Sequence, residues 1–178
     1  MSSFNIIKKY PDLLDLISLS ERERDYDLHT IFKRDIEENS MFSFRGRRIF
    51  PIKTDGKIDM ERLFKHLTCE GVKEKNENGS IYTKRVFDMD RSQRLHWINH
   101  HVTEKTPCNI DVFTVEEKDS KKRKVRKTYI YDHIEKYVII LEQQRSNAFY
   151  LLTAYYLNKE YGQKALEKKM NKKLSTPL

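Results

Sequence analysis

The second half of the chain holds four short runs in which apolar residues alternate with polar ones or follow one another directly. A β-strand points successive side chains to opposite faces, so such runs indicate strands with one or two buried faces. Polar stretches separate the runs, and strands that follow one another this closely usually pair as neighbours. We therefore predict an antiparallel meander with strands at 109–115, 125–131, 136–141 and 149–157.

Apolar residues spaced three and four apart predict helices in the rest of the chain. The predicted helices cover 6–17, 24–38, 58–69, 91–104 and 158–173. Two more strands, 41–50 and 81–87, and a polar loop, 73–80, lie between these helices. The expected fold is α+β, with helices packed on a four-stranded or slightly larger antiparallel meander sheet.

This order of elements divides the chain into two parts. Residues 1–55 are expected to form an N-terminal helical extension with a first strand, and residues 56–178 the core with its C-terminal helix. A chain of 178 residues is long enough for one domain with a hydrophobic core. We therefore expect the two parts to form one compact unit.

The net charge indicates which class of partner the protein binds. The chain carries a formal charge of +8. Because each neutralised phosphate releases counterions, a basic protein of this kind favours nucleic acid, although a merely soluble basic protein has the same charge. Cys69 and Cys108 have no metal or disulfide spacing, and the N-terminus has no apolar signal core, which together predict a reduced, cytoplasmic protein. No apolar run approaches the roughly 20 residues that a membrane helix requires, so no membrane partner is expected.

Candidate chemistry lies on the last strand and on the helix 91–104. Thr153 and Tyr155 are two residues apart, so their hydroxyl groups share one strand face. On the helix, Arg94, Trp97 and His101 share one stripe. The pair His96 and His100 has metal-binding spacing, but it lacks the glutamate and the third ligand of a zinc motif, so packing or solvated histidines are favoured.

Four short motifs carry a resemblance to a known family. They are Arg-x-x-Arg-Leu-x-Trp-Ile at 91–98, Arg-Lys-Thr-Tyr at 126–129, Tyr-Val-Ile-Ile-Leu at 137–141 and Leu-Leu-Thr-Ala-Tyr-Tyr-Leu at 151–157. In this order the motifs resemble the phage- and prophage-associated nucleases of the barnase–EndoU–colicin–RelE-like group, or BECR fold. The resemblance spans about 63–169. It implies a metal-independent endoribonuclease without a cofactor, acting as a toxin or in conflict between phage and host, although no single histidine here matches the family's base.

RNA cleavage without a metal requires three groups. A base removes the 2′-OH proton, a cation stabilises the phosphorane, and an acid protonates the 5′ leaving oxygen. Arginine suits the phosphorane because its planar fork contacts two oxygens, and histidine suits proton transfer near neutral pH. The catalytic candidates are Arg94, His100, His101, Arg126, Thr153 and Tyr155.

The expected partner is RNA, either tRNA or mRNA, and the resemblance adds a cognate antitoxin or immunity protein. A basic hairpin tip and two aromatic residues that could stack on a base supply candidate contacts. The RNA-binding candidates are Trp97, Lys121, Lys122, Arg123, Lys124, Lys127, Tyr129 and Arg145.

Other readings of the same residues stay open. Trp97 is more often a core residue than a stacking platform, and Arg94 could simply pair with an acidic neighbour. A metal-dependent nuclease would use Asp111 with Glu116 and Lys118, although Asp111 and Glu116 are too close in sequence for the usual arrangement on two strands. A nucleic-acid-binding or protein-binding module without catalysis would also explain the charge.

Overall fold

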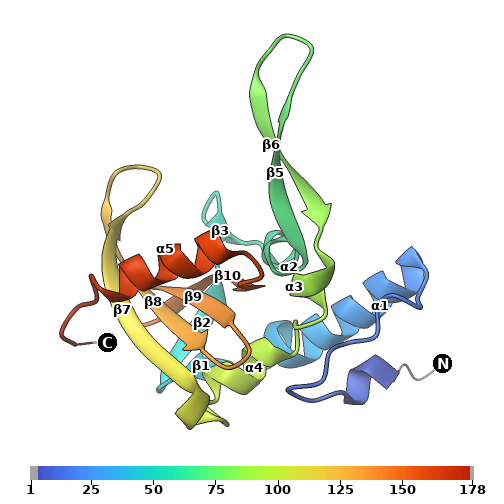
Figure 1. The fold of residues 1–178 in the computed structure, drawn as a ribbon, viewed down its shortest axis with the longest axis horizontal. Coiled ribbons are helices and arrows are strands. Elements are labelled where there is room, and N and C mark those ends of the chain that lie inside the picture. Colours follow the sequence, from blue (N-terminus) through green and yellow to red (C-terminus); the bar gives the residue numbers. More distant parts are fainter. Residues whose placement is uncertain (1–3, 177–178) are drawn as a thin grey trace.

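In the computed structural model, which describes residues 4–176, a six-stranded sheet forms the centre of the molecule (Figure 1). The strand order is β1 (Ser43–Phe44), β2 (Arg47–Pro51), β10 (Phe149–Tyr156), β9 (Tyr137–Gln143), β8 (Lys124–Asp132) and β7 (Ile110–Lys118). Strands β7 to β10 pair antiparallel in sequence, as the alternation predicted. The fold is therefore α+β and contains the expected meander.

The sheet differs from the expectation in size and direction. Strand β2 pairs in parallel with β10, with Ile49 opposite Phe149, and β1 extends the sheet beyond β2. The sheet is thus mixed, and the prediction of a purely antiparallel sheet was wrong. The cause is that β2 satisfies the backbone groups at the open edge of β10. Residues 41–50, expected as one strand of an extension, form a tight β1–β2 hairpin inside this sheet.

The two faces of the sheet bury two hydrophobic cores. The large core joins Ile139, Leu141 and Phe149 to helices α1 (Glu21–Phe32), α2 (Met60–Thr68) and α4 (Trp97–Val102). The small core joins Phe113, Tyr129 and Val138 to helix α5 (Glu160–Met170), which lies across the opposite face in Figure 1. Because strand neighbours point to opposite faces, a residue of β9 or β10 belongs to one core or the other.

The N-terminal stretch departs from the predicted helix 6–17. Only Phe4–Ile7 forms a short 3₁₀ helix, and residues 8–19 form no helix. Leu14 and Leu16 are both buried, and the Leu14 N–H donates to the carbonyl of Gln93. An i, i+2 burial pattern belongs to an extended chain, and Pro11 cannot donate a helical hydrogen bond. Helix α1 begins at a capping box between Ser20 and Glu23 and continues as a π-helical turn, Lys33–Glu37.

The predicted helix 91–104 is divided into two short helices. Helix α3 (Met89–Ser92) is capped by Asp88, whose side chain accepts from the Arg91 N–H, and α4 begins only at Trp97. Four residues in turn conformation, 93–96, separate them. The division leaves the expected stripe largely intact, because Arg94 still lies over the Trp97 ring and Trp97 still stacks with His101. A 3₁₀ turn, Pro107–Asn109, then leads into β7.

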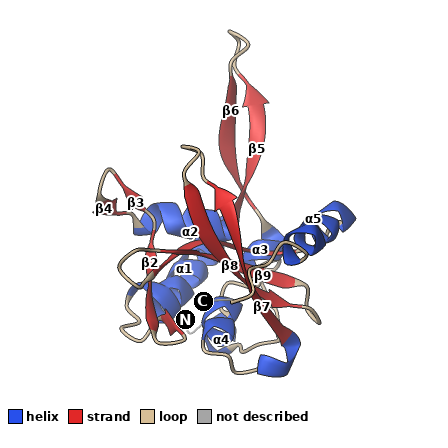
Figure 2. Cartoon of the chain, turned by 90° about the vertical axis from the view of Figure 1, so that its left-hand side faces the viewer, coloured by secondary structure: helices blue, strands red, loops and turns tan. Residues whose placement is uncertain are grey.

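A two-stranded arm projects from the body of the molecule (Figures 1 and 2). It consists of β5 (Cys69–Lys75), β6 (Ile81–Phe87) and the turn between them, and β5 and β6 pair only with each other. The expected loop 73–80 is a turn only at 76–80, because residues 73–75 pair with 81–83 as part of the arm. A smaller hairpin, β3 (Lys53–Thr54) with β4 (Lys57–Ile58), precedes α2. Within residues 4–176, no helix has the length and apolar character to cross a membrane.

Candidate functional site

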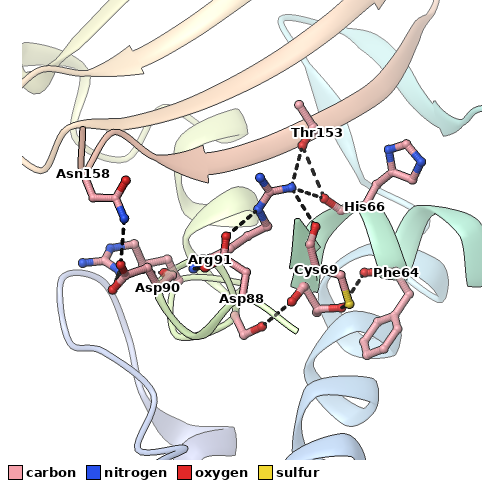
Figure 3. A network of polar contacts seen from close by, with 11 residues as sticks. Phe64, His66, Cys69, Asp88, Asp90, Arg91, Thr153 and Asn158 are labelled. Carbon is pink, nitrogen blue, oxygen red and sulfur yellow. Dashed lines mark hydrogen bonds and ion pairs between the residues drawn. The ribbon is translucent and has the colours of Figure 1, made fainter. Parts of the chain in front are cut away.

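The guanidinium of Arg91 is fixed at the foot of the arm (Figure 3). Its Nη1 donates to the carbonyl oxygens of His66 at 2.8 Å and Cys69 at 3.1 Å, and to Oγ1 of Thr153 at 3.4 Å. Its Nε lies 3.5 Å from the Asp88 carboxylate. Its Nη2 makes no hydrogen bond or ion pair with any residue in 4–176. Arg91 is therefore a preorganised cation with one nitrogen free for a ligand.

Tyr155 lies beside this arginine. The Arg91 Cζ is 5.7 Å from the centre of the Tyr155 ring. Burial raises the pKa of the Tyr155 phenol, and the charges of Lys169 and Arg91 only partly oppose this effect. Tyr155 therefore stays protonated near neutral pH and can donate a hydrogen bond or a proton.

A cavity of about 410 Å³ opens next to Arg91 and Tyr155, between α3, the end of β10 and the beginning of α5. We call it the foot pocket. Its charged and aromatic lining includes Glu70, Asp88, Asp90, Arg91, Tyr155 and Lys159. The pocket thus combines two cations, three carboxylates and the phenols of Tyr155, Tyr156 and Tyr161 in a space large enough for a small polar ligand or part of a nucleotide.

The three carboxylates of the foot pocket differ in what they already bind. Asp88 Oδ1 accepts from the Arg91 N–H at 3.1 Å, which caps α3. Asp90 accepts from Asn158 at 3.0 Å and faces Arg94 at 3.7 Å. Glu70 has neither a hydrogen bond nor an ion pair through its side chain within residues 4–176. Glu70 is therefore the carboxylate that can accept a proton without giving up a structural contact.

Arg94, predicted to meet Thr153 and Tyr155, contacts a different residue of β10. Its Cζ lies 3.9 Å from the ring centre of Tyr156 and 5.3 Å from that of Trp97. Arg91 takes the expected position instead, so the prediction of an arginine next to Thr153 named the wrong residue. The reason is that the Arg94 guanidinium donates to the Asp90 carbonyl and lies over Tyr156, which leaves the position beside Thr153 to Arg91.

His100 and His101 lie away from the foot pocket. His101 is fully buried and bonds the Trp97 carbonyl at 2.9 Å and Asp132 at 2.8 Å. It packs among residues of the large core, whereas Tyr155 packs against the small core on the other face of the sheet. His100 stacks on Tyr10 with ring centres 4.3 Å apart, and burial lowers its pKa to about 4. The structure therefore contradicts the prediction that either histidine is the base beside Tyr155.

Arg126 lines a second concave region, which we call the basic groove. This groove of about 710 Å³ runs between the beginning of β8 and the β9–β10 turn, and it shares no lining residue with the foot pocket. Its charged lining consists of Glu116, Arg123, Lys124, Arg126, Glu142 and Arg145. The structure thus brings Arg126 together with three predicted RNA contacts, but it does not bring Arg126 to Thr153 and Tyr155 as predicted.

Ion pairs within the β7–β8 hairpin engage two of the cations that were predicted to bind RNA. Arg123 lies 2.7 Å from Asp119, and Lys124 lies 3.2 Å from Glu116. The side chains of Lys121 and Lys122 are exposed and have no ion pair within residues 4–176. Only these two of the four tip cations are therefore available without breaking an existing ion pair.

Two predicted stacking residues and one predicted cation are engaged within the fold. Trp97 and Tyr129 are 1 % and 2 % exposed, so neither ring can stack on a base in this structure. Lys127 lies 3.0 Å from Glu117, and Glu117 also contacts Lys169 of α5 and the Tyr129 hydroxyl. Although burial raises the pKa of Glu117, the two lysines outweigh it and hold the pKa below its usual range. This cluster ties α5 to the sheet.

Three residues of the site were missed by sequence reasoning. Arg91 opens the Arg-x-x-Arg motif but was overlooked in favour of Arg94, and Glu70 lies in a strand that was not predicted. His66 of α2 lies 3.0 Å through its Nε2 from Nη2 of Arg85. Burial, followed by the charges of Arg85, Arg62 and Arg91, lowers the pKa of His66 to about 4.

The residues suggested as metal ligands pair with other side chains or with the backbone and do not form one group. Asp111 lies 3.3 Å from His133, and Glu116 pairs with Lys124. The His96 imidazole contacts the carbonyl of Asp12 at 2.9 Å. Within the part of the chain that the structure describes, no three His, Cys, Asp or Glu side chains are grouped as a metal site would require.

Comparisons of the chain with family models, with curated proteins and with solved structures find no match. The site and the sequence motifs are therefore the features that bear on function.

Proposed function

We propose that this protein is a metal-independent endoribonuclease of the BECR type, whose active site is the foot pocket. The observation that carries the proposal is the fixed guanidinium of Arg91, with a free Nη2, beside Tyr155 and Thr153. All three residues belong to the motifs on which the resemblance depends. The antiparallel meander with packed helices is also the arrangement that the resemblance implies.

The proposed chemistry begins with attack of the ribose 2′-OH on the adjacent phosphate. The phosphorane gains negative charge, which a cation already held in place stabilises without reorganisation. Arg91 supplies this cation through Nη2, and Lys159 adds a second positive charge at the pocket wall. Because Nη1 bonds two backbone carbonyls and Nε lies beside the Asp88 carboxylate, Arg91 is oriented before the substrate arrives.

Proton transfer requires a base and an acid near the same phosphate. Glu70 is the base in this proposal, since its carboxylate is unengaged and lines the foot pocket. Tyr155, protonated because burial raises its pKa, donates to the 5′ leaving oxygen or to the phosphate. This assignment replaces the histidines with groups that lie in the pocket.

The test is expression of the protein in cells, followed by sequencing of RNA ends. A discrete set of new 5′ ends should appear with the wild-type chain. Glu70→Gln and Tyr155→Phe should each reduce these ends by roughly 10²-fold, because each removes one proton-transfer group and little volume. Glu74→Gln is a matched control four residues along the same strand, and its ends should match wild type. Wild-type levels of cleavage in both Glu70→Gln and Tyr155→Phe would refute this active site.

A second candidate function is RNA binding without turnover. The observation in its favour is the basic groove, where Arg126, Arg145 and two further cations gather without any connection to the foot pocket. RNA binding with no new RNA ends, unchanged in Tyr155→Phe, would identify this function.

The biological role that we propose follows from the resemblance. An endoribonuclease of this kind would act on tRNA or mRNA in the cytoplasm, as a toxin or in conflict between phage and host, and a cognate antitoxin or immunity protein would restrain it. Slower growth upon induction of the wild-type chain but not of Glu70→Gln supports this role. Equal growth of the two strains would count against it.

A further inference from the structure

The two faces of the arm differ in charge. In an antiparallel pair, directly opposed residues point to the same face. Gly71 opposes Arg85, Lys73 opposes Thr83, and Lys75 opposes Ile81. The face that these six residues form carries three cations and no carboxylate, and we call it the basic face.

The opposite face of the arm holds two carboxylates and one cation, so its cation is balanced by a carboxylate. Glu74 opposes Tyr82, whose hydroxyl donates to Glu74 at 2.6 Å, and Lys84 lies 3.6 Å from the same carboxylate. Glu70 also belongs to this face, through its pairing with Val86. By contrast, Lys73, Lys75 and Arg85 have no carboxylate partner within residues 4–176. Like charges in a row repel one another, so a surface of this kind is completed by an anionic ligand.

The basic face continues onto α2 at the foot of the arm. Arg85 contacts the neutral imidazole of His66, and Arg62 lies one helical turn before His66. Arg91 stands on the other side of the same turn of α2, where it bonds the His66 carbonyl. Arg62, Arg85 and Arg91 thus all lie close to His66, at the junction between the basic face and the foot of the arm.

From this charge segregation we infer that the basic face of the arm binds the phosphate backbone of RNA extending beyond the cleavage site. The inference deepens the proposed nuclease function and rests on it. Strands of seven residues span roughly 23 Å. At roughly 3.4 Å per nucleotide, the arm reaches about seven nucleotides from the foot pocket. The substrate class is therefore an RNA long enough to occupy both, rather than a dinucleotide or a short fragment.

The experiment compares two RNA lengths in binding and in cleavage. One is a four-nucleotide RNA that reaches only the foot pocket, and the other is a 20-nucleotide RNA that also reaches the arm. Binding is followed by fluorescence anisotropy over a range of salt concentrations, so it is measured whether or not cleavage occurs. The variants are Lys73→Gln, Lys75→Gln and the double variant.

Lys84→Gln is the matched control. It lies on the same arm and removes the same single charge, but from the opposite face. Circular dichroism of each variant checks that the fold is retained. The exposed positions of Lys73, Lys75 and Lys84 allow substitution without loss of core contacts.

We expect the double variant to bind the long RNA about tenfold more weakly and to reduce the slope of log affinity against log salt by about 1.4, since each phosphate contact contributes about 0.7. Its binding of the short RNA, and the binding of both RNAs by Lys84→Gln, should match wild type. Equal losses in the double variant and in Lys84→Gln, or equal losses for both RNA lengths, would overturn the inference.

The outcome for the arm can be separated from the outcome for the active site. Arm-dependent binding of long RNA without cleavage would support the basic face and refute the nuclease. Cleavage of long RNA at the wild-type rate by the double variant, with unchanged affinity, would leave the nuclease in place and overturn the role of the arm. Absence of RNA binding by the wild-type chain would overturn both.

Discussion

The imidazole Nε2 of His101 lies 2.8 Å from the carboxylate of Asp132, and both side chains are shielded completely from solvent. The pair joins α4 to the end of β8. Burial opposes ionisation of Asp132, but hydrogen bonds from His101, the Glu135 N–H and the Tyr10 hydroxyl outweigh it and lower its pKa. A histidine held in this way positions elements of the fold.

Replacement of His101 should therefore destabilise the protein without disabling the active site. His101→Leu leaves the Asp132 carboxylate buried without its partner, which costs about 3–5 kcal/mol of unfolding free energy. Urea unfolding measures this loss, and His100→Leu serves as a control at a less buried position. The folded fraction of His101→Leu should cleave RNA at the wild-type rate. A stable His101→Leu protein that cannot cleave RNA would return this histidine to the catalytic mechanism.

Acidification should destabilise the protein through His96. Burial lowers the pKa of His96 to about 4, and its Nδ1 is buried without a hydrogen-bond partner. The unfolded chain takes up this proton near pH 6.5 and the folded chain only near pH 4, so stability rises with pH across this interval. The contribution lost between pH 6.5 and 4 is on the order of 2–3 kcal/mol.

His96→Gln isolates this contribution because the amide can still donate to the Asp12 carbonyl. Its thermal unfolding midpoint should vary less than that of wild type between pH 6.5 and 4. Parallel profiles of the two proteins would show that His96 does not set the pH dependence. His66 and His100, which are about half buried, should add smaller effects of the same sign.

Two arginines in the same segment should respond differently to a conservative change. Arg91→Lys keeps the charge but loses the planar fork that bonds Thr153 and leaves Nη2 free, so single-turnover cleavage should slow by roughly 10²-fold. Arg94→Lys should lower the melting temperature, because the stack on Tyr156 is lost, and leave the cleavage rate nearly unchanged. The reverse pattern would move the active site to the Tyr156 side of β10.

The chemical groups at the ends of the cleavage products should show which group is the nucleophile. If the 2′-OH attacks, the upstream product ends in a 2′,3′-cyclic phosphate, and the reaction continues in the presence of a chelator. Mass spectrometry of a defined RNA, cleaved with and without EDTA, measures both properties. Products with a 5′-phosphate and a 3′-OH, or loss of activity in EDTA, would point to a metal-activated water instead.

At the β7–β8 tip, only the unpaired lysines should contribute strongly to RNA binding. Lys121→Gln with Lys122→Gln should weaken binding and reduce the salt slope by about 1.4, whereas Lys124→Gln should do less, because Glu116 already neutralises Lys124. Salt titrations of the two variants provide the comparison. An equal effect per charge would mean that the ion pair of Lys124 opens when RNA binds.

Sequence reasoning succeeded where the pattern is local. Strands β8 and β9 were predicted because Tyr137–Gln143 and its neighbour alternate or remain apolar over a full strand length. The arm was only half predicted, since Cys69–Lys75 buries no face and so shows no alternation of apolar residues.

Interactions between distant segments could not be predicted, because they produce no local pattern in the sequence. The parallel pairing of Ile49 with Phe149 depends on an edge of β10 that exists only in the folded sheet. The choice between Arg91 and Arg94 depends on their contacts with Thr153 and Tyr156 of a distant strand, which the local side-chain periodicity does not show. The burial of His101 could not be predicted from local sequence either, because its partner Asp132 lies 31 residues away.

The pairing of β2 with β10 also determines when the sheet can be completed during synthesis on the ribosome. Ile49 leaves the ribosome 100 residues before its partner Phe149, a delay on the order of 5–20 s at typical rates of synthesis. Thr153 and Tyr155 arrive later still, so the nascent chain holds Arg91 and Glu70 for several seconds without the strand that completes the foot pocket. A nuclease built on this pocket would thus remain harmless to the message being translated until the β10 segment had left the ribosome.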